Sequence, residues 1–442
     1  MARRRTRIPL DVYLNDRLVG QLRRQTNGAV DFQYDKSWLD WQHALPVSLS
    51  MPLREDRYTG DTVIAVFDNL LPDSDVIKKR LAERVHADGA DVYSLLAKLG
   101  RDCVGALQFL PAGEKPNPAG SVQGRAISDD EIAEKLAQLA VDPLGMDEDD
   151  EFRLSLAGAQ EKTAYLFWKD RWHVPHGTTP TTHIMKPQIG VLSNGIDMTQ
   201  SVENEFFCLQ LMEAFGMPVA NAKIADFGSE RVLVVERFDR QWTKDDRLLR
   251  LPQEDCCQAL SVAPGLKYER DGGPGIKAVL DLLQGSDQPQ EDQNRYMKTQ
   301  ILFWLLGATD GHAKNFSLFL KPAGRFRLTP IYDVLSAQPA VDAGQLKLNR
   351  MKMAVAIGNG RHYVVSTIVP RHFLETADLA GLPRVVVVDA FKEFHEEADA
   401  AIERARSNLP KKFPKALVTS IVNGMRNRFA DVKIFLDDLP AA

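Results

Sequence analysis

The chain has 442 residues, with 55 Lys and Arg against 60 Asp and Glu and a formal net charge of −5 at pH 7. This near balance argues against a protein whose main role is to coat nucleic acid or an anionic membrane surface. The length is enough for about three domains of ordinary size, and the apolar content is enough to bury several cores.

The first residues, MARRRTR, are basic, but no apolar stretch follows them as it would in a signal peptide. The longest purely aliphatic runs, such as residues 385–388, are far shorter than the roughly 20 residues that span a bilayer. The cysteines form no disulfide framework and no CxxC pair, and we expect them to be small buried residues: Cys103, Cys208, Cys256 and Cys257. These features predict a cytoplasmic protein with no membrane partner.

Residues 8–35 alternate apolar and polar side chains around two turn signals, which predicts a small antiparallel meander. Between residues 61–100 the apolar residues recur at helical spacing, with a break in the middle and a helix-stopping glycine at the end. The acidic stretch at 141–152 indicates a solvated connection. We therefore expect residues 1–150 to form an N-terminal α+β domain.

Two further units are predicted after this domain. Residues 151–245 contain short β-like runs around one predicted helix, SVENEFFCLQLMEAFG at 201–216. Residues 246–442 are mostly helical, and the last helices have charged faces with prolines only at their breaks, as packed surface helices do. A small β unit followed by a helical unit is the order found in protein kinases.

The stretch GATDGHAKNF, residues 307–316, follows a dense apolar run and brings several charged and polar groups together. Protein kinases use an Asp that accepts the proton of the substrate hydroxyl and, in the pattern D-x-x-x-x-N, an Asn that holds a magnesium ion. Asp310 and Asn315 have this spacing. By itself the pattern also fits an Asx-capped loop or part of a metal-hydrolase site.

A magnesium ion on two phosphates is usually held by one or two protein carboxylates besides water. Asp333, in TPIYDV, is the candidate for the second ligand, because we expect the β-like segment at 315–333 to fold back as a hairpin. The alternative interpretation is an Asp that caps a turn at the end of a strand.

Lys186 ends the strand-like run THIMK, which resembles the strand that carries the phosphate-binding lysine of kinases. Glu205 flanks the apolar stripe of the next predicted helix, and its ion pair with the lysine would orient the amine on the phosphates. Glu203 is the competing candidate, less favoured because it faces further from the stripe.

The segment SLAGAQEKT, residues 155–163, lies where a phosphate-covering loop would be expected. Its small residues let backbone N–H groups approach phosphate oxygens. The candidate ligands in this loop are Ala157, Gly158, Ala159, Gln160, Glu161 and Lys162. The loop lacks G-x-G-x-x-G, and an ordinary tight turn is the alternative.

The segment VLVVERFDR follows the lysine along the chain, and backbone groups near Glu236 and Phe238 would meet the edge of an adenine ring. A plain edge strand is the alternative, but the order loop, Lys, Glu, hinge, Asp, Asn, Asp matches a kinase throughout. The ordered set predicts a phosphotransferase that uses ATP and Mg²⁺. The expected fold class is α+β, a protein-kinase-like bilobal fold with a β-containing N-lobe and a helical C-lobe, preceded by the small N-terminal domain.

Many stretches are similar to those of the HipA family, the kinase toxins of bacterial toxin-antitoxin modules: SLAGAQEKT, TTPTTHIMK, SVENEF, VERFDR, RLPQED, YERDGGPGI, GATDGHAKNFS and LTPIYD. The likeness covers nearly the whole chain, including FDNLLPDS and LLAKLGRDCVGAL in the first domain. It implies a serine/threonine protein kinase that arrests growth by phosphorylating an aminoacyl-tRNA synthetase, glutamyl-tRNA synthetase in the best-known members. Persistence under antibiotics would follow.

The resemblance implies a role for each candidate residue: the catalytic base Asp310, the magnesium ligands Asn315 and Asp333, the phosphate-binding Lys186, and the adenine hinge at Glu236 and Phe238. It also matches Ser155 to the autophosphorylated serine of the family. A phosphate at that position would repel the phosphates of ATP and eject the loop. A serine that only caps the turn is the alternative.

The family's partner is a small dimeric helix-turn-helix antitoxin, HipB, that binds operator DNA. The resemblance therefore implies a repressor complex of this chain with a HipB-like antitoxin and operator DNA. The basic segment MARRRTR would then lie within reach of DNA phosphates, whereas a frayed, solvated terminus is the alternative.

The chain departs from eukaryotic kinases at two places. Thr309 stands where the Arg of H-R-D would be, and YDV at 332–334 replaces D-F-G, which argues against activation-loop phosphorylation of the usual kind. His312 either orients Asp310 or packs against its surroundings. Lys314 either neutralises the transferring phosphoryl group or faces solvent.

Two other functions fit parts of the pattern. A small-molecule or lipid kinase is one, because such enzymes also use an Asp-x-His-x-x-Asn type of loop. The other is a catalytically silent co-repressor, a degenerate kinase that only binds its antitoxin. The intact Asp310, Asn315, Asp333 and Lys186 argue against the silent co-repressor.

Overall fold

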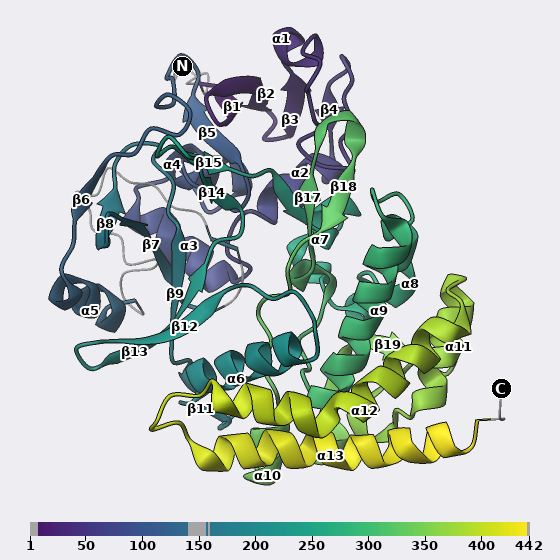
Figure 1. Cartoon of the computed structure of the whole chain (residues 1–442). Helices are drawn as coiled ribbons and strands as arrows, with labels where there is room; N and C mark the ends of the chain where they lie inside the picture. Colours follow the sequence, from purple (N-terminus) through teal and green to yellow (C-terminus); the bar gives the residue numbers. More distant parts are fainter. Residues whose placement is uncertain (1–7, 140–155, 158–159, 440–442) are drawn as a thin grey trace. The chain divides into compact units, whose positions relative to one another are not determined.

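The computed structural model describes residues 8–139, 156–157 and 160–439 (Figure 1). The chain divides into two compact units, each assembled from segments far apart in the sequence. The first unit comprises Met1–Pro187, Ala225–Gly265 and Ser317–Phe326, and the second comprises Gln188–Ile224, Leu266–Phe316 and Arg327–Ala442. The predicted boundaries at residues 150 and 245 stay a prediction.

The first unit begins with a five-stranded antiparallel sheet in the order β4-β3-β2-β1-β5. Val12, Leu22 and Phe32 point to its covered face and are fully buried, as the alternating pattern predicts. The helices after it begin at side-chain caps such as Ser74 and Asp91. The predicted meander is confirmed as β1 (Leu10–Leu14), β2 (Arg17–Arg24) and β3 (Val30–Tyr34), and the predicted helices as α2 (Asp61–Asp68), α3 (Asp75–Arg84) and α4 (Val92–Leu99). The structure adds α1 (Lys36–Leu39), β4 (Tyr58–Thr59) and β5 (Leu107–Pro111), which were not predicted.

A second sheet has six strands in the order β12-β13-β9-β7-β8-β6. One face packs on a helix, and the shared core includes Tyr165, Met185 and Val234 from the sheet and Ile132 from the helix. The helix begins at Ser128 with a capping box. The β-like runs predicted here are confirmed as β7 (Thr163–Trp168), β8 (Arg171–Pro175), β9 (His183–Pro187) and β13 (Glu230–Glu236). The structure adds three elements that were not predicted: β6 (Gly124–Ala126), α5 (Asp129–Ala137) and β12 (Ala222–Phe227).

Smaller sheets and one short helix follow the second sheet. The hairpin predicted at 315–333 is confirmed, since β17 pairs with β18 and the N–H of Lys321 donates to the carbonyl of Arg325 at 2.8 Å. These elements are β14 (Arg240–Trp242), β15 (Leu248–Arg250), β16 (Gln253–Asp255), α7 (Cys256–Ala259), β17 (Ser317–Leu320) and β18 (Phe326–Leu328).

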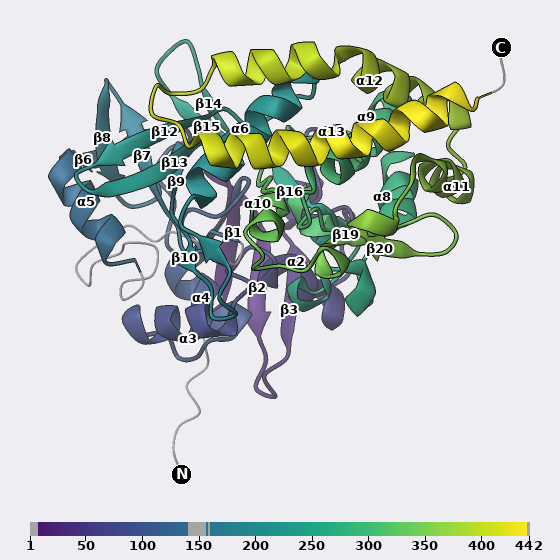
Figure 2. The same ribbon diagram turned by 90° about the horizontal axis from the view of Figure 1, so that it is seen from below.

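The second unit is mainly helical, as predicted. Two long helices, α12 and α13, run side by side in both ribbon views and pack on each other (Figures 1 and 2). The elements are β10 (Gly190–Val191), β11 (Asp197–Met198), α6 (Ser201–Ala214), α8 (Ile276–Leu283), α9 (Pro289–Leu306), α10 (Gln338–Asp342), β19 (Lys352–Ile357), β20 (His362–Val364), α11 (Pro370–Ala380), α12 (Arg384–Ser407) and α13 (Lys415–Asp437).

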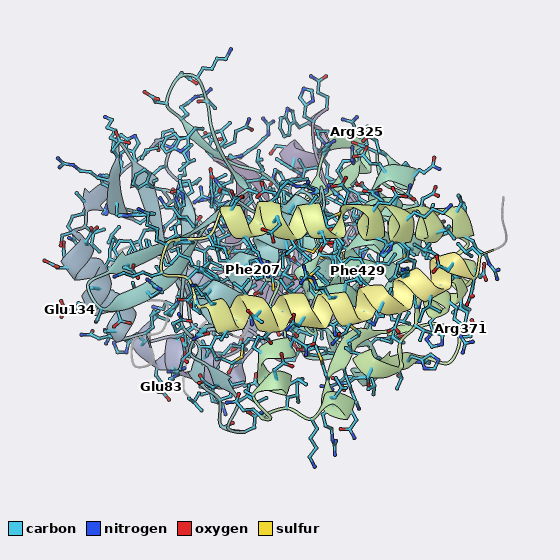
Figure 3. All side chains as sticks on the ribbon, turned by 60° about the horizontal axis from the view of Figure 1, so that its bottom comes forward. Glu83, Glu134, Phe207, Arg325, Arg371 and Phe429 are labelled. Carbon is cyan, nitrogen blue, oxygen red and sulfur yellow. The ribbon has the colours of Figure 1, made fainter. Side chains whose placement is uncertain are left out.

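The core of the second unit is rich in aromatic side chains. Phe207 of α6 and Phe429 of α13 are buried, while the labelled Arg371 at the start of α11 projects into solvent (Figure 3). The apolar run that precedes the candidate catalytic loop forms the end of α9, and Trp304 within it is fully buried. The buried helix end thus gives the loop a rigid base.

Within the described ranges, no helix combines the length and apolar character needed to cross a bilayer.

Candidate active site

The predicted phosphate-binding loop precedes β7 in the first unit. Part of it lies outside the described residues: Ser155, Gly158 and Ala159. The side-chain amide of Gln160 donates a hydrogen bond to the carbonyl of Pro187 at 3.0 Å. The Nζ of Lys162 donates to the carbonyl of Ala157 at 2.5 Å. The first bond holds the described part of the loop against the end of β9, and the second joins two residues of the loop itself.

Glu161 extends from the same loop and forms an ion pair with Arg80 of α3. Both side chains are about one-third exposed, at 30% and 32%. The carboxylate is therefore engaged by the N-terminal helices, and a role for Glu161 at a nucleotide stays a prediction.

Lys186 lies in β9, where it is 7% exposed and pairs with Leu233 of β13. On the other side of β9, Thr163 of β7 pairs with Met185. Because the two strands are antiparallel, the loop that enters β7 lies beside the lysine. The structure thus brings Lys186 and the described part of the predicted loop to one end of the same sheet.

The predicted hinge begins at the end of β13. Glu236 pairs with His183 of β9 and its side chain is exposed. Phe238 is half-buried and its ring lies edge-on to Phe319 of β17, with centroids 5.7 Å apart. This segment therefore follows the end of β13, an inner strand of the sheet that also carries Lys186.

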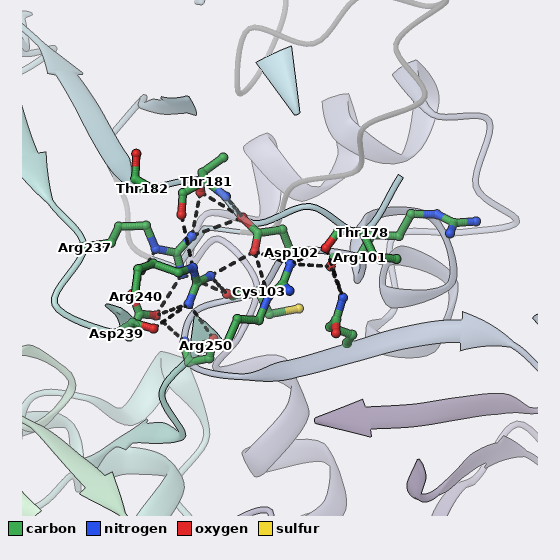
Figure 4. Close-up of polar contacts among 12 residues, drawn as sticks. Arg101, Asp102, Cys103, Thr178, Thr181, Thr182, Arg237, Asp239, Arg240 and Arg250 are labelled. Carbon is green, nitrogen blue, oxygen red and sulfur yellow. Dashed lines mark hydrogen bonds and ion pairs between the residues drawn. The ribbon is translucent and has the colours of Figure 1, made fainter. Parts of the chain in front are cut away.

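A buried cluster of charged side chains holds the hinge in place (Figure 4). Arg237 binds the carboxylate of Asp239 at 2.8 Å, and its Nη2 donates to the carbonyl of Cys103 at 2.8 Å. Arg240 and Arg250 both donate to Oδ1 of Asp102, at 2.9 and 3.0 Å.

Thr181 also donates to Asp102, through its N–H at 3.0 Å and its hydroxyl at 2.8 Å. Burial by itself would raise the pKa of Asp102, but the guanidinium groups of Arg240, Arg237 and Arg250 hold it well below its usual value. Burial lowers the pKa of Arg240 to about 10. The carboxylates therefore stay ionised, and the cluster joins the segment after α4 to the hinge.

Asp102 could not be singled out from the sequence, because the arginines that it pairs with lie more than one hundred positions further along the chain. The sequence does show the three arginines of the cluster, in VERFDR and RLPQED. Their close spacing in the chain was the signal from which a buried ionic cluster could have been predicted.

In the second unit, α9 ends at Gly307, which has the left-handed conformation (φ 67°) that suits a glycine cap. The following turn requires Gly311, since a Cβ atom there would lie 2.3 Å from the ring of Phe303. The N–H of His312 then donates to the carbonyl of Asp310 at 2.8 Å. The apolar helix thus ends in a tight loop that presents the predicted catalytic residues.

Asn315 closes this loop. Its side-chain Nδ2 donates a hydrogen bond to the backbone carbonyl of Asp310 at 2.8 Å. Because the side-chain nitrogen of Asn315 is engaged in this bond, its side-chain oxygen is the atom that can bind a cation. The spacing D-x-x-x-x-N therefore forms one compact turn.

The side chain of Asp310 is 52% exposed, so a substrate can approach it. The hydroxyl of Tyr268 donates to its Oδ1 at 2.5 Å. The ring of His312 is buried against Tyr268, with centroids 4.9 Å apart, and its Nε2 lies 3.8 Å from the same oxygen. His312 therefore packs and also adjoins Asp310, so the two interpretations of this residue are compatible.

Tyr268 was not among the residues predicted from the sequence, although it begins the stretch YERDGGPGI. A tyrosine in a Gly-rich loop gives no signal of its distant partner, and only the likeness of this stretch to other chains pointed to it.

Asp333 adopts a left-handed backbone conformation, with φ 62°. Its neighbour Tyr332 donates from its hydroxyl to the carbonyl of Lys314 at 3.1 Å, and Ser336 pairs with Ala308 as an isolated bridge. Residues on both sides of Asp333 are therefore bound to the loop at 308–315. Asp is among the non-glycine residues that adopt this backbone region most readily.

Of the two interpretations of Lys314, the one in which its side chain faces solvent is wrong, because the residue is only 5% exposed. It lies in a turn of 3-10 helix at Ala313–Asn315, within the loop itself. Its action on the transferring phosphoryl group stays a prediction.

The reason given for preferring Glu205 over Glu203 is also wrong. Helix α6 is buried nearly all round, so Glu203 is 3% exposed and Glu205 is 2% exposed. Glu203 accepts a hydrogen bond from the side-chain amide of Gln188 at 2.7 Å. The pairing of Glu205 with Lys186 stays a prediction.

Helix α6 is tied to the segment that carries Asp333. The side-chain Nδ2 of Asn204 donates to the carbonyl of Ser336 at 2.8 Å, and the N–H of Ser336 donates back to its Oδ1 at 2.9 Å. The second unit thus holds α6, the loop and Asp333 in one arrangement.

In the part of the chain that the structure describes, no group of three or more His, Cys, Asp or Glu side chains is arranged to hold a metal ion. A magnesium ion on a nucleotide needs fewer protein ligands, because phosphates and water complete its oxygen shell. Asn315 offers an amide oxygen and Asp333 a carboxylate, and both are hard oxygen donors of the type that Mg²⁺ prefers. The residues present therefore fit this ion.

The cysteines are all buried, as predicted. Burial raises the pKa of Cys103 and of Cys208 to about 12. Neither thiol is reactive near neutral pH.

Comparison with known proteins agrees with this geometry. A family model described as HipA-like C-terminal domain matches residues 154–404, and one described as HipA N-terminal domain matches residues 10–110. The chain is 34% identical to a Sinorhizobium fredii protein, Y4mE, that is named as a kinase, over 79% of this chain and 80% of that protein. It is 28% identical to the serine/threonine-protein kinase toxin HipA of Shewanella oneidensis, over 91% of this chain and 90% of that protein.

Among solved structures, the chain is similar to HipA in the complex of Shewanella oneidensis HipA, HipB and operator DNA. The TM-score is 0.80 at 25% sequence identity, and the match covers 98% of this chain and 100% of that one. The predicted α+β, protein-kinase-like fold class is confirmed. The chain belongs to the HipA family of serine/threonine-protein kinases.

Proposed function

We propose that this chain is a kinase toxin that transfers the γ-phosphate of ATP to a serine of a bacterial protein and thereby arrests growth. The acceptor class that the family suggests is an aminoacyl-tRNA synthetase, with glutamyl-tRNA synthetase as the first candidate. The observation that carries the proposal is the loop in which the amide of Asn315 is bonded to Asp310 while the carboxylate of Asp310 stays accessible.

In this proposal Asp310 is the catalytic base. Its carboxylate accepts the proton of the serine hydroxyl as the oxygen attacks phosphorus. Tyr268 positions that carboxylate through its hydrogen bond. Lys314, a buried residue of the same loop, offsets negative charge on the transferring phosphoryl group.

Asn315 and Asp333 would hold Mg²⁺, which, when bound, neutralises charge on the β- and γ-phosphates. The chain's own contribution is to fix the two oxygen donors. The Asn315 amide is oriented by Asp310, and the segment of Asp333 is bonded to the loop through Tyr332.

On the nucleotide side, Lys186 would bind the α- and β-phosphates and the backbone at Glu236 and Phe238 the adenine edge. Ala157, Gln160 and Lys162 would cover the phosphates, together with Glu161 and the loop residues outside the described ranges. One sheet carries the lysine and the hinge, and the loop is bonded to that sheet. The continuous family match over residues 154–404, which contains Lys186 and Asp310, supports the assignment of these residues to a kinase site.

Two regulatory features belong to the same proposal. Autophosphorylation of Ser155 would inactivate the enzyme, because a phosphate there would repel those of ATP. The chain would join a HipB-like helix-turn-helix antitoxin on operator DNA, by analogy with the Shewanella oneidensis complex of HipA, HipB and operator DNA. The proposal places the protein in the cytoplasm, where its acceptor and its operator are found.

Radiolabelled ATP tests the central assignment. Wild-type protein is expected to transfer label to itself or to purified glutamyl-tRNA synthetase, and Asp310→Asn is expected to transfer at least about 1,000-fold less, since general base and positioning effects are both lost. Asp281→Asn, which removes an exposed carboxylate on α8, is the matched control. Undiminished labelling by Asp310→Asn contradicts the assignment.

The self-inactivation is tested separately by mass spectrometry after long incubation with ATP and magnesium. Phosphate is expected on Ser155, and Ser155→Ala is expected to stay toxic without losing activity over time. An unmodified Ser155 in active protein argues against this form of regulation.

A further inference from the structure

Helix α9 ends directly before the proposed catalytic loop, and its last backbone carbonyls need partners. The last four carbonyls of an α-helix have no N–H partner within the helix. The first two N–H groups after α9 take two of these carbonyls. The carbonyls of Leu305 and Leu306 therefore depend on donors from elsewhere in the second unit.

Both carbonyls accept hydrogen bonds from side chains that are distant in the sequence. Ser336, three residues after Asp333, donates from its hydroxyl to the carbonyl of Leu306 at 2.6 Å. Arg428 of α13 donates from its Nε to the carbonyl of Leu305 at 2.9 Å. The end of α9 is thus held both by the segment of Asp333 and by the C-terminal helix.

Arg428 is a buried cation. Its exposed fraction is 8%, and among the described residues no carboxylate forms an ion pair with it. Burial lowers its pKa to about 10, although Asp342 and Asp431 act in the opposite direction, and the guanidinium stays charged at neutral pH. The carbonyl end of a helix carries partial negative charge, which favours a cation there. Arg428 therefore caps α9 with its charge as well as with its hydrogen bond.

A glutamine fixes the direction of this guanidinium. Nη1 of Arg428 donates to Oε1 of Gln338 at 3.1 Å, and Nε2 of Gln338 donates to Oδ1 of Asp342 at 2.8 Å. Helix α13 leaves room for the amide at Gly424, where a Cβ atom would lie 2.5 Å from Oε1 of Gln338. Glycine weakens a helix interior, and here the close approach of Gln338 requires it. Gly424 and Arg428, one helical turn apart, thus form one binding face for Gln338 and the end of α9.

The guanidinium also borders the first residue of the loop. A Cβ atom at Gly307 would lie 3.3 Å from Nη2 of Arg428 and 2.3 Å from the terminal methyl of Met351. The carbonyl of Gly307 accepts a hydrogen bond from the N–H of Ala337 at 2.9 Å. The start of the loop is therefore enclosed by α13, β19 and the segment after Asp333.

We propose that Arg428 is a positioning residue for phosphate transfer, because it binds the end of α9 and so holds the loop that carries Asp310 and Asn315. The inference rests on the proposed function, since it takes Asp310 as the base. Arg428 lies beyond the family match at 154–404, so this proposal makes α13 part of the working kinase. A displacement of about 1 Å can cost about 100-fold in rate, and the position of the loop therefore bears directly on kcat.

Hydrogen exchange of the backbone amides tests the positioning without any need for kinase activity. The loop at 308–316 contains hydrogen-bonded amides, and in Arg428→Ala these are expected to exchange at least about tenfold faster, while the strands of the first unit keep their protection. Ethylguanidinium at millimolar concentration, far below the molar range that unfolds proteins, is expected to restore slow exchange, and ethylammonium is not. Arg426→Ala, which breaks an exposed pair with Asp399 on the same helix face toward solvent, is the matched control and should exchange as wild-type protein does.

The labelling rate tests the consequence for catalysis. With the folded fraction measured by circular dichroism, kcat per folded chain is expected to fall at least about tenfold in Arg428→Ala and to recover in part with ethylguanidinium. A residue that only stabilises the fold would lower the folded fraction and leave kcat per folded chain unchanged. Gln338→Ala, which removes the acceptor of Nη1, is expected to show a smaller loss of the same kind, and it decides the question if Arg428→Ala does not fold.

Unchanged exchange of the loop in these variants overturns the proposal, and so does faster exchange with a normal kcat per folded chain. Wild-type protein without kinase activity would contradict the proposed function instead. In that case the exchange measurement still decides whether Arg428 holds the loop.

Discussion

The side-chain amide of Asn315 donates a hydrogen bond to the backbone carbonyl of Asp310, 2.8 Å away. One turn thus links the proposed base to a proposed metal ligand, and the bond decides which atom of the Asn315 side chain remains for the metal. Loss of either residue would disturb the position of the other, since they share one short loop.

Asn315→Ala is therefore expected to lower kcat by at least about 10–100-fold, the range seen when groups that order a metal site are removed. The magnesium concentration needed for half-maximal activity should rise in the same variant. Titration of the labelling rate with magnesium measures both effects. A variant with normal magnesium dependence would mean that Asn315 only shapes the loop.

Tyr268→Phe removes a single hydroxyl that binds the Asp310 carboxylate and keeps the ring against His312. A hydrogen bond to a charged group contributes about 1.5–3 kcal/mol when buried, and the half-exposed carboxylate places the loss at the lower end. We expect about a tenfold decrease in kcat with an unchanged KM for ATP, measured by steady-state kinetics. An unchanged kcat would remove Tyr268 from the positioning of the base.

Asp102→Asn removes the carboxylate that Arg250 binds and leaves Asp239 as the carboxylate partner of Arg237 and Arg240. Removing one member of a buried ionic network costs about 3–5 kcal/mol, so urea unfolding of the first unit is expected at a clearly lower midpoint. Asp226→Asn, which breaks an exposed pair with Arg231, is the control and should change stability by less than about 1 kcal/mol.

The pH dependence of the same cluster has a definite sign. The folded state holds the pKa of Asp102 below its usual value, so its contribution is fully present above about pH 4 and is lost as the pH falls below that. Unfolding midpoints of wild-type and Asp102→Asn proteins should converge in acid. A difference that stays constant down to pH 3 would contradict the ionic account of this cluster.

Glu254 has the opposite behaviour. It is 1% exposed, and burial raises its pKa to about 8. Because a Glu of the unfolded chain ionises near pH 4.3, the free energy of unfolding should fall as the pH rises from about 4.3 to 8. Glu254→Gln keeps an acceptor for the N–H of Leu49 and has no proton to lose.

Comparison of urea unfolding at pH 5 and pH 8 tests this. Wild-type protein is expected to lose roughly 2–4 kcal/mol more than Glu254→Gln between these pH values. Equal losses in the two proteins would show that Glu254 ionises normally.

The sequence predicted the parts of the site that depend on local spacing. Asp310 and Asn315 are close in the chain, and one turn at the end of a buried helix is enough to bring them together. The strand that carries Lys186 and the hairpin before Asp333 followed from alternating side chains and turn residues. Patterns of this kind are set by a few adjacent residues and need no knowledge of distant contacts.

Burial of polar groups could not be predicted in the same way. Glu203 was placed further from the apolar stripe of its helix, and a solvent-facing side chain was one of the two interpretations of Lys314, but both residues are buried. The partners of Arg237 and Arg240 include Asp102, which is remote in sequence, and the pairing depends on the assembled first unit. Tertiary packing, which the sequence pattern does not show, therefore determines which of these polar side chains are buried.

The central proposal is that Lys186 and Asp333 are both needed for the binding of ATP with magnesium. Calorimetric titration of the dephosphorylated protein with ATP and magnesium tests it most directly. We predict one ATP per chain, binding that weakens at least about tenfold in Lys186→Ala and in Asp333→Asn, and a double variant whose loss is smaller than the two losses combined. Absence of ATP binding in the dephosphorylated wild-type protein, or binding that neither variant weakens, would contradict the account.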